Sequence, residues 1–347
     1  MGLPAGCAWL GGRWATELVD LTADPTALDS TGFWAVVATF EGELTCARFA
    51  RTRPAPTPPQ GRWPAVPRPG WRSSLDAGGY RAAVTAVRRA IAAGEVYQVN
   101  VCRVLSAPLP PAPVSAAGRL AGLAGLLAGG NPAPYAGFVA VPQRDLAVVS
   151  ASPELFLRRD GATVRSGPIK GTAPTVAGLL PKDTAENVMI VDLVRNDLGR
   201  VCQPGSVGVP DLCRVEEHPG LVHLVSVVEG RLRPGVGWAG LFEATFPPGS
   251  VSGAPKSSAL RLLAALEPVP RGPYCGAVGW VDADAAQGVL AVGIRSFWLT
   301  GAAGGAAGEV HFGTGAGITW DSDPAAEWQE TELKAARLLG LAGRATG

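Results

Sequence analysis

The sequence has very little lysine. Of its 347 residues 30 are Lys or Arg, but only four are Lys, at positions 170, 182, 256 and 334, which leaves 26 Arg. Methionine is also rare, with two residues, whereas Ala, Gly and Pro are abundant. Because this bias is typical of coding composition, we expect Lys to remain mainly where Arg cannot replace it. Arg is permanently charged, whereas Lys can lose its proton and act as a nucleophile.

The chain also lacks a large net charge. Its 30 basic and 29 acidic residues leave a formal charge of +1, which argues against a broad electrostatic surface for nucleic acid or anionic lipid. With 47% hydrophobic and 17% charged residues, the composition is that of a globular protein and excludes disorder for most of the chain. Small-molecule chemistry is therefore favoured.

Long hydrophobic runs are absent. Residues 1–14 contain no basic region followed by an apolar run, and no segment has about 18 uninterrupted apolar residues. We therefore expect a soluble, cytoplasmic protein. The cysteines lack metal-type spacing, so we expect reduced, structural thiols. They are Cys7, Cys46, Cys102, Cys202, Cys213 and Cys275.

Apolar periodicity predicts alternating helices and strands. Helices are expected at 80–93, 113–129, 181–198, 256–266 and 324–341. Strands are expected within 31–50 and at 96–105, 137–141, 146–150, 154–158, 162–166, 222–232, 274–282, 289–299 and 310–312. The helix at 181–198 is apolar around much of its circumference, which predicts burial. Residues 51–70 carry seven prolines and are expected to form a linker or an irregular wrap.

Two glycine-rich segments differ from nucleotide-binding loops. In Gly249–Ser257, Ala254 and Pro255 separate the second glycine from Lys256, whereas a P-loop requires Lys directly after that glycine. The segment Gly313–Gly317 has no helix at the place where a dinucleotide fold needs one. Neither segment predicts nucleotide binding, although both could present backbone N–H groups to a carboxylate.

Three charged residues of the last helix share one face. Glu327, Glu330 and Lys334 are spaced by three and four residues, which places them on the same side of the helix. A solvated face with a Glu–Lys pair is the ordinary interpretation. The functional one adds Glu186 to form a trio of carboxylates suited to Mg²⁺, although Glu186 could equally complement its own helix dipole.

Lys170 and His223 also allow two interpretations. Lys170 lies in a tight turn between Pro168 and Gly171, where a desolvated amine could be neutral and attack carbon. A flexible surface lysine is the alternative. His223 is flanked by apolar residues on a predicted strand, which is typical of a structural histidine.

Taken in order, these pieces resemble the chorismate-utilising enzyme family, which includes anthranilate synthase component I, aminodeoxychorismate synthase component I, isochorismate synthase and salicylate synthase. The resemblance runs from about residue 80 to 340. Its motifs are 94–103, Ser152-Pro-Glu154, 168–172, 185–193, 195–197, 223–224, 246–256, 271–276, 293–295, 315–318, 321–324 and 327–334.

The resemblance implies an α+β fold with two packed antiparallel β-sheets flanked by helices. Residues 1–75 are then a short strand region and proline-rich linker within the same fold, and residues 76–347 are the chorismate-binding catalytic domain. It also implies an active site between the sheets.

Two positions distinguish branches of this family. Members that add water resemble one another in having Lys where this chain has Gln98, and Gln there fits members that use ammonia. Lys170 resembles the aminodeoxychorismate synthase component I branch, whereas anthranilate synthases typically have Ala. The resemblance thus implies conversion of chorismate and ammonia to 4-amino-4-deoxychorismate, on a route to 4-aminobenzoate and folate. Anthranilate synthase component I is the alternative.

The resemblance also implies roles for individual residues. Glu186, Glu327 and Glu330 would hold Mg²⁺, which takes the ring carboxylate of chorismate. Glu154 would be the general acid, Lys170 the nucleophile at C2, and His223 part of the wall facing the ring. Further substrate-binding positions would be Gln98, Gly171, Thr172, Ser250, Tyr274, Arg295, Gly315, Gly317 and Lys334. Ammonia would come from a separate glutamine amidotransferase subunit.

Overall fold

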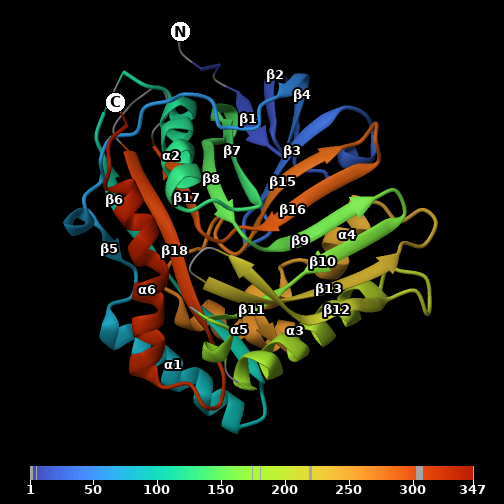
Figure 1. The fold of residues 1–347 in the computed structure, drawn as a ribbon, viewed down its shortest axis with the longest axis vertical. Coiled ribbons are helices and arrows are strands. Elements are labelled where there is room, and N and C mark those ends of the chain that lie inside the picture. The colour runs from blue at the N-terminus through green and yellow to red at the C-terminus, as the bar shows by residue number, and fades with distance from the viewer. Residues whose placement is uncertain are drawn as a thin grey trace.

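The computed structural model describes residues 3–4, 6–111, 113–173, 175–179, 181–218, 221–301 and 308–346 (Figure 1). Its helices are α1 (Ala77–Ala92), α2 (Ala116–Gly130), α3 (Pro181–Gly199), α4 (Trp238–Thr245), α5 (Lys256–Leu266) and α6 (Pro324–Ala342). Its strands are β1 (Cys7–Leu10), β2 (Arg13–Thr22), β3 (Phe33–Ala38), β4 (Leu44–Pro54), β5 (Arg72–Ser73), β6 (Gln98–Leu109), β7 (Tyr135–Val141), β8 (Leu146–Ser152), β9 (Leu155–Asp160), β10 (Thr163–Gly167), β11 (Ile169–Ala173), β12 (Gly208–His218), β13 (Leu221–Arg231), β14 (Gly253–Ala254), β15 (Ala277–Asp282), β16 (Gln287–Val292), β17 (Ser296–Thr300) and β18 (Gly308–Ile318).

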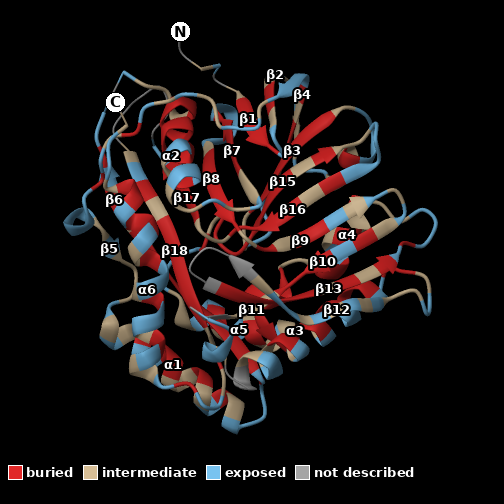
Figure 2. Ribbon diagram, in the orientation of Figure 1, coloured by how far each residue is buried: buried red, intermediate tan, exposed pale blue. Residues whose placement is uncertain are grey.

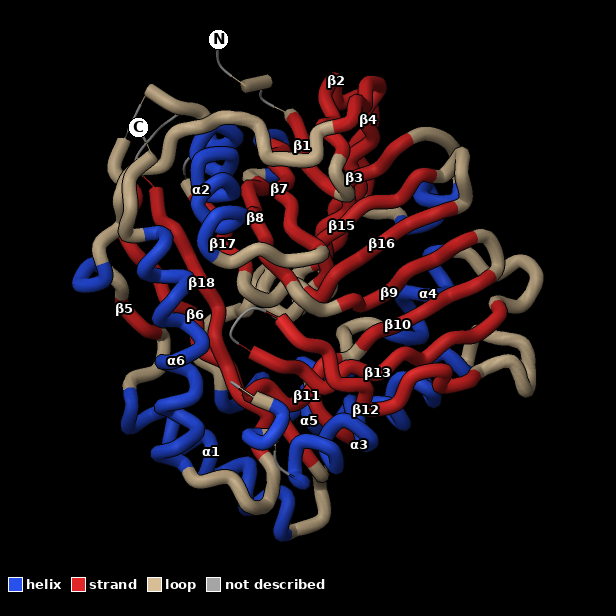
Figure 3. Tube along the Cα trace, in the orientation of Figure 1, coloured by secondary structure: helices blue, strands red, loops and turns tan. Residues whose placement is uncertain are grey.

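These strands form one antiparallel sheet rather than the two separate sheets expected (Figure 3). At one end, the short strands β5 and β14 pair with β6, and β6 pairs with β18. From β18 the sheet continues through β17, β8, β7, β1, β2, β4 and β3. From β3 the sheet continues through β15, β16, β9, β10 and β13 to β12 and β11. A strongly twisted sheet of this size curls instead of staying flat. The two ends, β6–β18 and β11–β13, consequently approach each other.

Helices cover the outer faces of this curled sheet (Figure 2). α2 and α6 pack over β7, β8 and β18 and bury residues such as Leu120, Phe297 and Leu338. α1 and α5 cover β6 around Val84 and Leu263. α3 packs on β11, β12 and β13. Helices therefore pack against the outer face of the sheet at both of its ends.

The structure confirms all five predicted helices within a few residues at each end. The strand expected at 289–299 divides into β16 and β17, because Arg295 has a φ of 52° and interrupts the extended chain. Helix α3 is only partly buried, and its Val188 is 44% exposed, so the expectation of a buried helix is wrong. The sheet covers only one side of α3, so the apolar residues on its other side remain in contact with solvent.

The N-terminal region pairs directly with later strands. β3 lies beside β15, and β1 lies beside β7. Residues 51–54 of the proline-rich stretch belong to β4, contrary to expectation, whereas the rest forms an irregular wrap in which buried Trp63 donates from Nε1 to the Ala342 carbonyl at 2.8 Å. No helix in the described part of the chain is long and apolar enough to cross a membrane.

Candidate active site

The site lies where the two ends of the curled sheet meet. Lys170 projects from β11, and its Nζ donates to the Ser250 carbonyl at 3.0 Å. On the other side, a Cβ added to Gly317 of β18 would be 3.7 Å from that same Nζ. The amine of Lys170 therefore lies between strands that are about 150 residues apart in the sequence.

Glu154 faces Lys170 from the link between β8 and β9. It is 4% exposed, and its backbone N–H donates to the Ser152 hydroxyl at 3.2 Å. Burial raises the pKa of its carboxyl, while a hydrogen bond with Ser250 and the charge of Lys170 oppose this rise. A raised pKa enlarges the protonated fraction of Glu154, which is the form that a general acid needs.

Burial lowers the pKa of the Lys170 amine, although the carboxylates of Glu186 and Glu154 counteract the shift. Lys334 lowers it further and Glu330 raises it, so both residues of α6 act on the same amine. A lysine with a lowered pKa has a larger neutral fraction, which is the nucleophilic form. Lys170 is therefore not a flexible surface side chain, because its amine is held by the Ser250 carbonyl, and its role as a nucleophile stays a prediction.

Gln98 lines the opposite wall of the site. It is 1% exposed on β6, and a Cβ at Gly317 would come within 2.4 Å of its Nε2. Its Oε1 has no hydrogen-bond partner among the described residues. Since an unpaired buried acceptor is costly, this oxygen is suited to accept a hydrogen bond from a bound molecule.

The charged residues of α6 also face this space. Lys334 Nζ donates to the Gly315 carbonyl at 3.0 Å and pairs with Glu330 Oε1 at 2.6 Å. Glu327 is buried and accepts a hydrogen bond from the Ser322 hydroxyl at 2.6 Å. The shared helix face predicted from the sequence is therefore present, and it points toward β18.

Tyr274 and Arg295 close one side of the site. A Cβ on Gly313 would lie 2.0 Å from Cγ of Tyr274, so only glycine allows this ring to lie against β18. Burial lowers the pKa of the Arg295 guanidinium, while the charge of Glu154 raises it, which places these two groups near each other. A phenol hydroxyl and a guanidinium are donor groups that can bind an anion, and the assignment of both residues to substrate binding stays a prediction.

The remaining predicted residues lie around Lys170. Gly171 has a φ of 78°, and a Cβ there would be 2.8 Å from Cβ of Asp183. His223 is buried on β13, in register with Thr172 of β11. The side chains of Thr172 and Lys182 lie outside the described part of the structure.

Glu186, Glu327 and Glu330 have the right chemistry for Mg²⁺, but their geometry in the described part of the chain does not form a metal site. Carboxylate oxygens are the ligands that Mg²⁺ prefers. Among the described residues, however, no three His, Cys, Asp or Glu side chains converge on a common point suited to a metal ion. Glu330 is instead engaged by Lys334. The Mg²⁺ assignment to Glu186, Glu327 and Glu330 stays a prediction.

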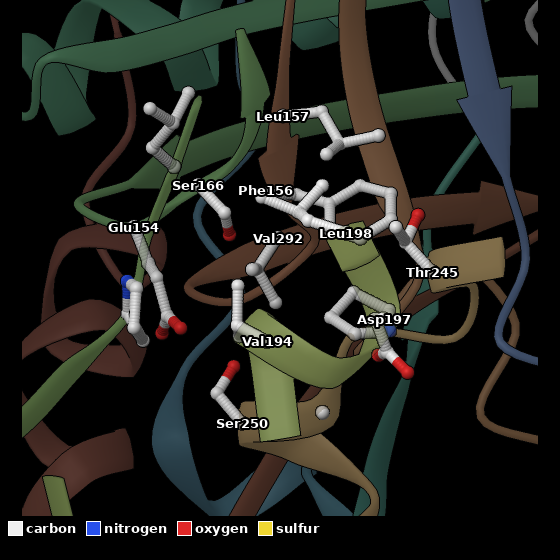
Figure 4. Close-up of a pocket in the computed structure, with 14 residues that line it drawn as sticks. Glu154, Phe156, Leu157, Ser166, Val194, Asp197, Leu198, Thr245, Ser250 and Val292 are labelled. Atoms are coloured by element: carbon white, nitrogen blue, oxygen red, sulfur yellow. The ribbon is translucent and has the colours of Figure 1, made fainter. Parts of the chain in front are cut away.

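A small pocket has Glu154 and Ser250 at one end (Figure 4). Apolar side chains such as Val194 and Val292 line its middle. At its far side Asp197 accepts a hydrogen bond from Lys256 Nζ at 2.7 Å. The sequence contained both members of this ion pair within motifs, but nothing in their spacing indicated that they would meet.

A model of the chorismate binding enzyme family matches residues 39–340. The chain belongs to this family. Anthranilate synthase component 1 of Streptomyces coelicolor is 38% identical over 316 residues, which cover 86% of this chain and 59% of that protein. Aminodeoxychorismate synthase component 1 of Klebsiella aerogenes is 35% identical over 282 residues, which cover 78% of this chain and 59% of that protein. This chorismate binding enzyme therefore spans about three fifths of the length of these two relatives.

The fold of this chorismate binding enzyme is also found in a solved structure. Anthranilate synthase component I from Streptococcus pneumoniae superimposes with a TM-score of 0.77 and 22% sequence identity, covering 98% of this chain and 93% of that one. The likeness establishes the α+β architecture with its large curled sheet. The similar identities to anthranilate and aminodeoxychorismate synthases leave the product open.

Proposed function

We propose that this protein aminates chorismate at C4 and forms 4-amino-4-deoxychorismate, as an aminodeoxychorismate synthase component I. The observation that carries the proposal is the pairing of Lys170 with Glu154. Burial lowers the pKa of the amine and raises the pKa of the acid. One group is thereby favoured as a neutral nucleophile and the other as a proton donor.

The proposed reaction has two displacements. The Lys170 amine bonds to C2 while the ring double bonds shift and the C4–O bond breaks, and Glu154 gives its proton so that the hydroxyl leaves as water. Ammonia then bonds to C4, the double bonds shift back, and the C2–N bond to Lys170 breaks. The proton that the nitrogen loses on becoming a neutral amine returns to Glu154. The net change is replacement of a hydroxyl by an amine, and the enzyme regains its lysine.

Substrate binding is assigned to the opposite wall. Chorismate carries two carboxylates, and Lys334, Arg295 and Tyr274 supply hydrogen-bond donors on the side of β18. A Mg²⁺ ion, when bound, would neutralise the ring carboxylate. Ser250, Gly171, Thr172, Gly315 and Gly317 would shape the pocket and present backbone groups, and His223 would form the wall that faces the ring.

The nucleophile of the second step is proposed to be ammonia rather than water. Gln98, which like Lys170 lies near Gly317, offers an unpaired buried acceptor that can take a hydrogen bond from ammonia but cannot remove a proton from water. The component 1 relatives support a glutamine amidotransferase subunit as the source of this ammonia.

The anthranilate synthase reaction is the second candidate, because the Streptomyces coelicolor relative carries that name at 38% identity. Incubation of the enzyme with chorismate, ammonium salt and Mg²⁺ separates the two. Formation of aminodeoxychorismate, detected by chromatography and mass, is expected. Anthranilate fluorescence in its place would replace our proposal with this alternative.

The covalent step has a direct test. Enzyme mixed with chorismate in the absence of ammonia and then quenched should gain, in its intact mass, the mass of chorismate less one water. Peptide mapping should locate the gain at Lys170, and the Lys170→Ala variant should lack it. Equal masses for the wild type and the variant would exclude lysine as the nucleophile.

A further inference from the structure

Arg271 is a fully buried arginine that the proposed chemistry does not use. It is 1% exposed and follows α5, and its guanidinium lies 4.0 Å from the ring centroid of Phe40. Nε and Nη2 donate to the two carboxylate oxygens of Glu267, both at 2.7 Å. This pairing of a planar fork with a carboxylate fixes the plane of the guanidinium.

The remaining donors of Arg271 reach two backbone carbonyls at the active site. Nη1 donates to the Val251 carbonyl at 2.8 Å, and Nη2 donates to the Asn100 carbonyl at 2.7 Å. Val251 follows Ser250, whose carbonyl accepts the hydrogen bond of Lys170. Asn100 is two residues from Gln98 on β6, which places both on the same face of that strand. One guanidinium therefore joins the segment that holds Lys170 to the strand that carries Gln98.

The same network fixes the turn that carries Tyr274. The carboxylate of Glu41 accepts the backbone N–H of Arg271 at 2.7 Å and that of Gly272 at 3.1 Å. Glu267 also accepts the backbone N–H of Cys102 on β6 at 2.8 Å. Three segments that contribute to the site are thus held by one network of charged side chains around the buried Arg271.

We propose that Arg271 is a positioning residue for Lys170 and Glu154. Its rigid fork sets the distance between the Ser250–Val251 segment and β6, and so the place of the amine relative to the acid. This inference rests on the proposed roles of those two residues. A lysine at position 271 would keep the charge but could not reach all four acceptors in one plane.

The test compares Arg271→Lys with Arg119→Lys. Arg119 is also fully buried, but it lies on α2, outside the site, and donates to the Pro110 carbonyl. Both variants remove a buried guanidinium, so both should lower the melting temperature. Only Arg271→Lys should lower kcat for chorismate amination, by about 10²-fold as expected for a small displacement of reacting groups, with little change in KM.

A second measurement does not depend on turnover. Cyanate carbamylates neutral amines, and the rate at Lys170 can be followed by mass spectrometry of its peptide. We expect this rate to change in Arg271→Lys and to stay at the wild-type value in Arg119→Lys. If Lys170 has no catalytic role, the proposed function fails, yet the carbamylation rates still report whether Arg271 positions the amine.

Glu267→Gln provides a variant for the case in which Arg271→Lys does not fold. It leaves Arg271 in place with a weaker acceptor and should produce a smaller change in kcat and carbamylation in the same direction. Unchanged kcat and unchanged Lys170 carbamylation in folded Arg271→Lys or Glu267→Gln would overturn the proposal and leave Arg271 with a role in stability alone.

Discussion

The two walls of the site hold their charged groups in different surroundings. On the wall formed by β11 and the β8–β9 link, burial shifts the pKa of Lys170 downward and that of Glu154 upward. On α6, the side chains of Lys334 and Glu330 are about half exposed and form an ion pair at 2.6 Å. Burial favours the neutral form of a titratable group, whereas exposure to water sustains its charge.

The difference in burial between the two walls suits them to two different roles in the proposed reaction. Groups that exchange protons or bonds with the substrate profit from being neutral at the start of the reaction. Groups that bind a dianionic ligand and its counterion profit from remaining charged. The buried wall is therefore suited to the reaction and the α6 wall to binding, and substitutions on the two walls should affect different kinetic constants.

The largest effect is expected on the buried wall. Glu154→Gln should lower kcat by about 10²- to 10⁴-fold, because the departing hydroxyl loses its proton donor. The pH profile should change as well. In the wild type the rate should fall as pH rises through the raised pKa of Glu154, and this descending limb should be absent from the variant.

Glu95→Gln is the matched control, since Glu95 is an exposed carboxylate that precedes β6. It should keep both the rate and the shape of the profile. A Glu154→Gln enzyme with wild-type kcat would show that another group protonates the hydroxyl, and the contrast between the two walls would lose its chemical basis.

On the α6 wall, Glu330→Gln should weaken the response to Mg²⁺. Loss of a ligand should raise the Mg²⁺ concentration for half-maximal rate by at least the roughly 10- to 100-fold that is typical when an outer-shell partner is removed. Titration of EDTA-treated enzyme with MgCl₂ measures this. A normal Mg²⁺ response would remove Glu330 from the predicted ligand set and agree with its observed pairing to Lys334.

The helices and the charged face of α6 could be predicted because their signals are local. The spacing of Glu327, Glu330 and Lys334 along one chain segment already implies a shared face. The glycine segments were likewise recognisable as unsuited to nucleotides, and the structure places Gly313–Gly317 within β18. Such inferences need only the geometry of one element.

Contacts between distant segments could not be derived from periodicity. The curling that brings β11 to β18 depends on the accumulated twist of the whole sheet, and the expected pair of sheets turned out to be continuous. The bonds from Arg271 to Val251 and Asn100 also join segments whose spacing carries no signal. In the sequence, only the resemblance to a family predicts that Lys170 and Glu154 belong to one site.

The smallest effect is expected from Lys334→Met. Its ammonium bonds to the Gly315 carbonyl and lies on the half-exposed α6 wall, so a contact with a substrate carboxylate is partly screened by water. We expect KM for chorismate to rise about tenfold, near the lower limit for a hydrogen bond to a charged group, while kcat stays close to that of the wild type. Initial rates over a range of chorismate concentrations measure both constants. A fall in kcat with unchanged KM would instead mean that Lys334 acts mainly on the Lys170 amine, whose pKa it lowers, and the binding wall would then share in the chemistry.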